Sequence, residues 1–430
     1  MFFPSTRIKA LLLVLSFATG AQAREWKDVS GRSIEAEMLG VDQGNAVVLN
    51  AAKQRVSLPL KKLSPADQAW VRQWSEGKSA LQLFPAPLWS LTVQQPEVRV
   101  TGGAQKGVGF VFNSPHYEFR CDAEVSPSVM NDFATVAEGT LRLVYSLPVA
   151  FPALEGKTYS ARILQSEEAY ARAGGPAGSG GVFIASMSGD GVLLVPFSSL
   201  GIEQFAGRNT KGYDYSATVL IHEMVHQATG ELLTLMPRWV SEGLAEYAAN
   251  TIYRNGVFYT GERDRILSLR QRLEGYDKLT RGNGQSFAAP GTGVTGNGPA
   301  RPMESWIMKP SQLLSVSEAA WRTDVNSNAA LVQVHRLYLS SMFMMHYYLH
   351  LADNGDARRI RLYFQELNKA STYFRTRGKE GSLPEELVRQ KGLTLDEAQD
   401  VFLKHLYSPS ELQALDADFK TRFNALGFRL

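Results

Sequence analysis

The sequence predicts an α+β protein with a small β-rich domain near the N-terminus and a larger mixed domain whose C-terminal half is helical. Short alternating apolar segments fill 24–75, whereas strand and helix patterns alternate from residue 116 onward. A chain of 430 residues with 44% hydrophobic residues is long enough for two or more domains with sizeable cores. The expected parts are a targeting segment over 1–23, a small domain over 24–75, a linker over 76–115 and a large domain over 116–430.

Charge and cysteine content narrow the class of protein further. The net charge of +3 is spread over the whole chain without a basic stripe, so neither nucleic-acid binding nor a polybasic membrane anchor is indicated. Cys121 is the only cysteine, so no internal disulfide can form. Stability must therefore come from packing.

Residues 1–23 contain the three parts of a secretory signal peptide in order. Arg7 and Lys9 precede the apolar run 11–17, and an A-x-A cleavage signal ends at Ala23. The apolar run is too short to span a bilayer, and a buried N-terminal helix is the alternative interpretation. We expect an exported chain that is cleaved near Ala23 and is periplasmic or extracellular, with no membrane span in its mature form.

The segment 24–75 predicts a small β-barrel that ends in a short helix. Its alternating apolar segments are separated by turn signals, and Ser64-Pro65 supplies an N-cap followed by proline at the first helical position. The segments 24–28, 35–37, 58–64 and 67–68 resemble the Sla homology domain, an SH3-like barrel found in endocytic adaptors and in many exported bacterial proteins. In adaptors this module binds short peptide motifs. The resemblance implies either a peptide ligand or a plain structural role.

Strand and helix patterns alternate in the first part of the large domain. We expect strands over 117–123, 158–164, 181–187 and 191–197, and helices over 126–145 and 166–173. The last two strands should form a hairpin around 188–190. The glycine-rich segment 174–181 lacks the lysine of a P-loop, which favours a flexible connection over a phosphate site.

The HExxH motif at 222–226 is the most informative feature of the chain. Histidines four residues apart on a helix project from one face, so His222 and His226 can share one metal ion. Glu223 lies beside that face, where its carboxylate can take a proton from a water that the ion has made more acidic. The helix should run from about 216 to 227 and stop near Gly230. A histidine pair on a buried helix without a metal is the alternative.

A second segment, WVSEGLAEY at 239–247, offers the third ligand. Glu242 opens a helical stretch after a short reversal, with Pro237 at its first turn, and three protein ligands leave a fourth position open. The segment resembles the glutamate helix of the gluzincin zinc peptidases, in which the glutamate before glycine is the third zinc ligand. The resemblance implies a zincin-like fold with bound Zn²⁺. Glu242 follows His226 by 16 residues, a shorter separation than in the aminopeptidase and thermolysin-like groups.

Further candidates follow from helical spacing and from the same resemblance. Glu246, one turn after Glu242, can accept the free ring N–H of a ligating histidine, or it is a surface carboxylate. Tyr338 lies on an apolar helix expected over 329–351, in a stretch that resembles the gluzincin segment whose tyrosine stabilises the oxyanion; a core tyrosine is the alternative. In zincins the strand before the HExxH helix commonly pairs with substrate. Strand 192–197 is therefore a candidate substrate edge, or an ordinary interior strand.

Other features carry less chemistry. His346 and His350 repeat the spacing of four residues, but no glutamate is adjacent, so they indicate structural histidines. The glycine-rich stretch 283–301 is either an active-site flap or a surface insertion. Trp239 is expected in the core.

Together these features predict an exported zinc metallopeptidase that acts on a peptide or protein substrate. His222, His226 and Glu242 would bind Zn²⁺, Glu223 would activate water, and Tyr338 would steady the oxyanion. Fe(II) also suits two histidines and a carboxylate, but the glutamate adjacent to the first histidine favours hydrolysis. The alternative function is a catalytically inactive zincin-fold scaffold or peptide-binding protein of the cell envelope.

Overall fold

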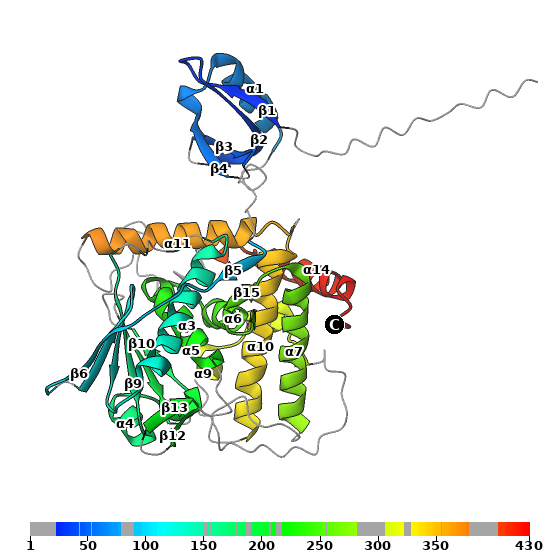
Figure 1. Ribbon diagram of the computed structural model, residues 1–430. Helices are drawn as coiled ribbons and strands as arrows, with labels where there is room; N and C mark the ends of the chain where they lie inside the picture. The colour runs from blue at the N-terminus through cyan, green and yellow to red at the C-terminus, as the bar shows by residue number, and fades with distance from the viewer. Residues whose placement is uncertain are drawn as a thin grey trace, which may run out of the picture. The chain divides into compact units, whose positions relative to one another are not determined.

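The chain divides into two compact units, Met1–Ala86 and Pro87–Leu430, which are described separately below (Figure 1). The computed structural model describes residues 23–42, 44–52, 54–78, 90–107, 109–149, 151, 154, 156–177, 179–185, 191–205, 208–211, 217–254, 256–281, 306–321, 328–353, 355–377 and 403–430. The targeting segment up to residue 22 and the insertion at 283–301 lie outside these residues. The mixed α and β composition that the sequence predicts is confirmed.

The first unit is a small antiparallel sheet followed by a short helix. The sheet has the order β1 (Arg24–Lys27), β2 (Ser33–Asp42), β3 (Asn45–Asn50) and β4 (Arg55–Pro59). A 3₁₀ turn, η1 (Leu60–Lys62), leads into α1 (Pro65–Ser75), whose N-cap is Ser64 as expected. Trp26 is fully buried beneath the sheet, and Arg24 joins β1 to α1 through an ion pair of 2.6 Å with Asp67. The expected strands and helix are confirmed, while the likeness to an SH3 barrel stays a prediction.

A six-stranded mixed sheet forms one layer of the second unit. Its order is β10-β11-β9-β8-β7-β6, in which β8, β9 and β11 are parallel to one another and the outer pairs are antiparallel. The strands are β6 (Thr101–Gln105), β7 (Gly109–Asn113), β8 (Tyr117–Cys121), β9 (Tyr159–Leu164), β10 (Val182–Ile184) and β11 (Val192–Pro196). The hairpin expected from the sequence is confirmed as β10 and β11.

The edge of the sheet differs from the one expected. β11 lies between β10 and β9, so the prediction of a substrate edge over 192–197 is wrong and the alternative, an interior strand, holds. The two terminal strands of the described sheet are β6 and β10, and β10 is the preceding strand of the hairpin. Parallel pairing with β9 explains this, because Val192 to Pro196 is an unbroken apolar run buried on both faces.

The linker expected over 76–115 is shorter than the sequence suggests. β6 and β7 belong to the main sheet, and β5 (Thr92–Gln94) pairs with β15 (Val257–Tyr259), which in turn pairs with β14 (Ile252–Arg254). A further hairpin is formed by β12 (Ile202–Phe205) and β13 (Arg208–Lys211). The second unit thus begins at Pro87 rather than at 116. These strands are short, and two glycines interrupt the apolar pattern of β6.

Helices pack on the sheet and form the rest of the second unit. They are α3 (Pro127–Ser146), α4 (Glu167–Arg172), α5 (Thr218–Ala228), α6 (Arg238–Ala249), α7 (Glu262–Arg281), α8 (Pro310–Leu314), α9 (Glu318–Trp321), α10 (Asn328–His350), α11 (Arg358–Arg377) and α14 (Leu412–Ala425). The described residues of this unit also include the 3₁₀ turns η2 (Phe197–Leu200) between β11 and β12, η3 (Gly230–Leu235) between α5 and α6, and η5 (Pro409–Glu411) directly before α14. Among the described helices, none is long and apolar enough to cross a membrane.

The packing of α10 positions the region around the motif. This helix lies beside α7 and packs against α6 (Figure 1). A Cβ atom on Gly243 of α6 would lie 2.6 Å from the Ser341 carbonyl oxygen of α10, so glycine is what permits this close approach. α6 is buried from Trp239 to Ala249, because α5, α10 and α3 all pack against it.

Candidate metal centre

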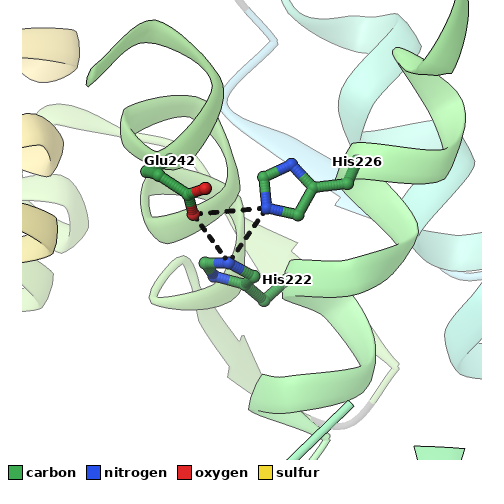
Figure 2. Close-up of side chains that lie close together, drawn as sticks. All are labelled: His222, His226 and Glu242. Atoms are coloured by element: carbon green, nitrogen blue, oxygen red, sulfur yellow. Dashed lines mark hydrogen bonds and ion pairs between the residues drawn. The ribbon is translucent and has the colours of Figure 1, made fainter. Parts of the chain in front are cut away.

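The side chains of His222, His226 and Glu242 converge on one point between α5 and α6 (Figure 2). The two histidine Nε2 atoms are 3.1 Å apart. Glu242 Oε2 lies 3.2 Å from Nε2 of His222 and 3.3 Å from Nε2 of His226. Within the described part of the chain, this is the one group of three such side chains whose ligand atoms could hold a metal ion.

The spacing of these three atoms fits a zinc ion. Tetrahedral ligands about 2.0 to 2.1 Å from zinc are separated from one another by about 3.3 Å. The observed separations of 3.1, 3.2 and 3.3 Å match that geometry. The donor types, two imidazole nitrogens and one carboxylate oxygen, are those of a catalytic zinc site that keeps its fourth position open. The donor set therefore fits the ion that the sequence predicts.

The electrostatics of the three side chains favour positive charge at their meeting point. Burial works against ionisation of Glu242, yet the charge of His226 and the hydrogen bond from His222 outweigh it and hold the pKa of Glu242 well below its usual value. Burial also works against a charged His222, but hydrogen bonds to Glu242 and Glu246 raise its pKa well above the usual value. A buried carboxylate here needs a cation, which either protonated imidazole or a metal ion supplies.

Glu246 lies behind His222, where the sequence predicts a partner for the ring. Its Oε1 is 3.4 Å from Nδ1 of His222. Its Oε2 accepts hydrogen bonds from Arg272 Nε at 2.9 Å and from Asn250 Nδ2 at 3.1 Å. Burial opposes the charge of Glu246, but Arg272 prevails and lowers its pKa to about 2. Sequence reasoning missed Arg272 because it comes from α7, 26 residues further along the chain.

Glu223 is held by the edge strand of the sheet. Its Oε2 accepts the backbone N–H of Phe183 in β10 at 2.9 Å. A Cβ atom on Gly181 would lie 3.1 Å from Cγ of Glu223, so the end of the glycine-rich segment packs directly against this side chain. Ser179 of the same segment shares a hydrogen bond of 2.6 Å between its hydroxyl and that of Tyr170. The segment expected as a flexible connection therefore forms one wall beside the candidate base.

Tyr338 lies against the first histidine of the motif. Its ring stacks on that of His222, with centroids 5.8 Å apart and planes inclined by 28°. Trp321 of α9 stacks on Tyr338 in turn, at 6.3 Å and 25°. The charge of Glu242, together with burial, raises the pKa of Tyr338 well above its usual value, so its hydroxyl keeps its proton at neutral pH. Trp321 was not predicted, because no regular spacing connects it to the motif.

One further cation approaches the three ligands. Arg238 Nη1 lies 3.8 Å from Glu242 Oε1, one turn earlier on α6. Its side chain is 46% exposed, so screening by water weakens this pair. Arg238 and Glu242 are four residues apart on one helix, a spacing from which this ion pair could have been predicted.

The second histidine pair is embedded in aromatic side chains. Tyr247 Oη lies 2.8 Å from His350 Nε2, and the His346 ring packs against that of Phe423. Burial, reinforced by Arg265, lowers the pKa of His346 to about 3, so this imidazole is neutral at pH 7. Trp239 is buried against Tyr348, as expected of a core residue.

Comparison of the chain with protein-family models and with curated proteins finds no match.

Proposed function

We propose that this protein is a zinc-dependent metallopeptidase that hydrolyses peptide bonds by means of a metal-activated water. The observation that carries the proposal is the convergence of His222, His226 and Glu242 at zinc-ligand spacing, with Glu223 adjacent on the same helix. The resemblance of 239–247 to the gluzincin glutamate helix supports the same assignment. Export, suggested by the signal-peptide pattern of 1–23, would place the activity outside the cytoplasm.

Zinc bound at these residues would polarise the substrate carbonyl and acidify a water molecule. Glu223 would act as the general base. A carboxylate that follows a metal ligand on the same helix can take the water proton and pass it to the leaving amine. The Phe183 N–H fixes one oxygen of this carboxylate at 2.9 Å, which limits its rotation. Fixed geometry of this kind is what proton transfer requires.

Tyr338 would donate a hydrogen bond to the oxyanion that develops on the substrate carbonyl. Its ring is fixed against His222 at 5.8 Å, close to the three ligands. The ordinary pKa of a tyrosine is about 10, so the phenol is a hydrogen-bond donor at neutral pH. Loss of one such donor costs on the order of 10²- to 10³-fold in rate.

An extended peptide is the substrate form that the sheet edge favours. β10 pairs with β11 on one side and is the terminal strand of the main sheet, so its outer side can add one more strand. Pairing through backbone groups tolerates varied side chains. The N–H of Phe183 on this strand already contacts Glu223, which places the edge next to the candidate base.

The test is a Glu223→Gln variant of the mature chain, assayed on an unbiased peptide library with zinc measured by mass spectrometry. Glutamine keeps the size of the side chain but cannot take a proton. We expect wild-type protein with one zinc per chain and a variant that keeps its zinc but cleaves about 10²- to 10⁴-fold more slowly. Glu97→Gln, on an 85% exposed side chain, is the matched control. Wild-type protein without zinc, or equal cleavage by Glu223→Gln, would contradict the proposal.

A further inference from the structure

Arg272 is a buried cation that pairs with Glu246, the carboxylate behind the ring of His222. Its side chain is 9% exposed and that of its partner, Glu246, is 8% exposed. The two meet at 2.9 Å, from Nε to Oε2, and join α7 to α6. An ion pair buried to this extent is weak support for stability, because desolvation offsets most of its attraction. Its place behind a candidate metal ligand suggests another role.

The two oxygens of Glu246 have different partners. Oε2 accepts hydrogen bonds from Arg272 and from Asn250, at 2.9 and 3.1 Å. Oε1 is thereby turned towards Nδ1 of His222, which lies 3.4 Å away. Asn250 is itself held by a second hydrogen bond, of 2.8 Å, to the Glu246 carbonyl oxygen. The carboxylate is thus fixed from one side and faces the histidine with the other.

The orientation of His222 decides which nitrogen can bind a metal. A neutral imidazole carries one N–H, and an acceptor at Nδ1 keeps that proton there and leaves the Nε2 lone pair available. Nε2 of His222 is the atom that lies 3.1 Å from its counterpart in His226 and 3.2 Å from Glu242 Oε2. Partners of this kind typically contribute a factor of about 10 to 100 in metal affinity.

We propose that Arg272 is a positioning residue of the metal centre, which acts through Glu246 to hold the His222 ring with Nδ1–H donated backwards and Nε2 facing the ion. The inference rests on the metal centre but not on peptide hydrolysis. It assigns a role to a residue 30 positions beyond Glu242 and on a different helix.

A second basic side chain near Glu246, that of His335, is uncharged in the wild-type protein. Burial, together with the charge of Arg272, lowers the pKa of His335 to about 4. This imidazole is therefore neutral at pH 7, and its Nδ1 is buried without a hydrogen-bond partner. In the wild-type protein at pH 7, Arg272 is thus the cation that fixes the direction of Glu246.

The first test is a double-mutant cycle on zinc affinity. Arg272→Gln, Glu246→Gln and the double variant are titrated with zinc against a chelator. Arg359→Gln serves as the control, because Arg359 forms an ion pair of 3.0 Å with a different carboxylate, that of Asp353. Each single variant should bind zinc about 10- to 100-fold more weakly, and the double variant no more weakly than the weaker single one. Independent, multiplicative losses would overturn the proposal, as would wild-type affinity in Arg272→Gln.

The second test reads the histidine directly. The zinc-loaded chain is labelled with ¹⁵N-histidine, and the signal of His222 is assigned by its loss in His222→Gln. Wild-type protein and the Arg359→Gln control should show an Nδ1 proton that exchanges slowly with water, and Arg272→Gln should show fast exchange. Equal exchange in all three would overturn the proposal, whereas a general loss of packing would broaden every histidine signal.

Misfolding of Arg272→Gln is controlled by removing both charges. Arg272→Met combined with Glu246→Gln leaves no buried charge unpaired, so it should fold. It should then bind zinc as weakly as Glu246→Gln alone; a further loss of affinity would argue against action through Glu246. Both tests are read without peptide cleavage. Wild-type protein that binds zinc but cleaves no peptide would defeat the proposed function and leave the role of Arg272 standing.

Discussion

A buried carboxylate defines the chemistry of this protein at the scale of single residues. The Glu242 side chain is 7% exposed. Its Oε2 lies 3.2 and 3.3 Å from the two histidine Nε2 atoms, and its Oε1 lies 3.8 Å from Arg238 Nη1. Such a group is stable only with positive charge beside it. A divalent ion satisfies that need without protonating the histidines, which explains why these three residue types belong together.

Gly181 limits the space available to Glu223, the proposed general base. A methyl group here would lie 3.1 Å from Glu223 Cγ and 3.4 Å from the Leu194 carbonyl oxygen, so the Glu223 side chain would have to move by a few tenths of an ångström. We expect Gly181→Ala to lower kcat about tenfold or more with zinc affinity unchanged, because proton transfer is sensitive to such displacement. Gly261→Ala, whose new methyl would have its nearest neighbour at 3.9 Å, is the control. Equal kcat in both variants would show that Glu223 is not held as described.

His346 makes stability depend on pH. The unfolded chain protonates this imidazole near its usual value of 6.5, whereas the folded chain does so only near about 3. The unfolded state therefore binds more protons between these values, and the contribution of His346 to stability is lost as pH falls from 6.5 towards 3. We expect His346→Gln to lose less stability over this interval in urea unfolding measured at several pH values. Parallel pH profiles for the two proteins would contradict this assignment.

At the scale of elements, the connection between α5 and α6 explains how the short ligand separation is possible. Glu242 follows His226 by 16 residues, a shorter separation than in the aminopeptidase and thermolysin-like groups. The intervening chain forms the compact 3₁₀ turn η3 over Gly230–Leu235, and Pro237 then caps α6 in an extended conformation. This tight reversal returns Glu242 Oε2 to within 3.3 Å of both histidines.

The contact between α6 and α10 is a second requirement at this scale. Gly243 follows the third ligand directly, and a Cβ there would lie 2.6 Å from the Ser341 carbonyl oxygen. We expect Gly243→Ala to push the helices apart, to destabilise the fold by about 1 to 3 kcal/mol and to weaken zinc binding through Glu242. Thermal unfolding and zinc titration measure the two effects, again with Gly261→Ala as control. Unchanged zinc affinity in a destabilised variant would show that α10 does not position Glu242.

At the scale of the whole molecule, local patterns predicted much of the fold. The HExxH helix was expected over 216–227 and α5 covers Thr218–Ala228, because helical periodicity and the stop at Gly230 are properties of neighbouring residues. The same reasoning predicted the hairpin of β10 and β11 and the N-cap Ser64. Convergence of Glu242 on the histidines could be anticipated from the short reversal between the helices.

Features that depend on distant segments could not be predicted in this way. Arg272 and Trp321 reach the metal centre from helices far along the chain, and no regular spacing links them to the motif. β11 was assigned to an edge from the resemblance to zincins, and its pattern alone could not show that β9 pairs on its other side. β5 and β6 lie in the segment expected as a linker, because three-residue strands and paired glycines carry little periodicity.

The most direct measurement is the anomalous scattering of crystals of the mature chain grown with zinc, recorded on both sides of the zinc absorption edge. It locates the ion without reference to activity. The account predicts one peak about 2.0 to 2.2 Å from Nε2 of His222, Nε2 of His226 and the nearer carboxylate oxygen of Glu242. A peak bound by other residues, or no peak at these three side chains in crystals that contain zinc, would contradict it.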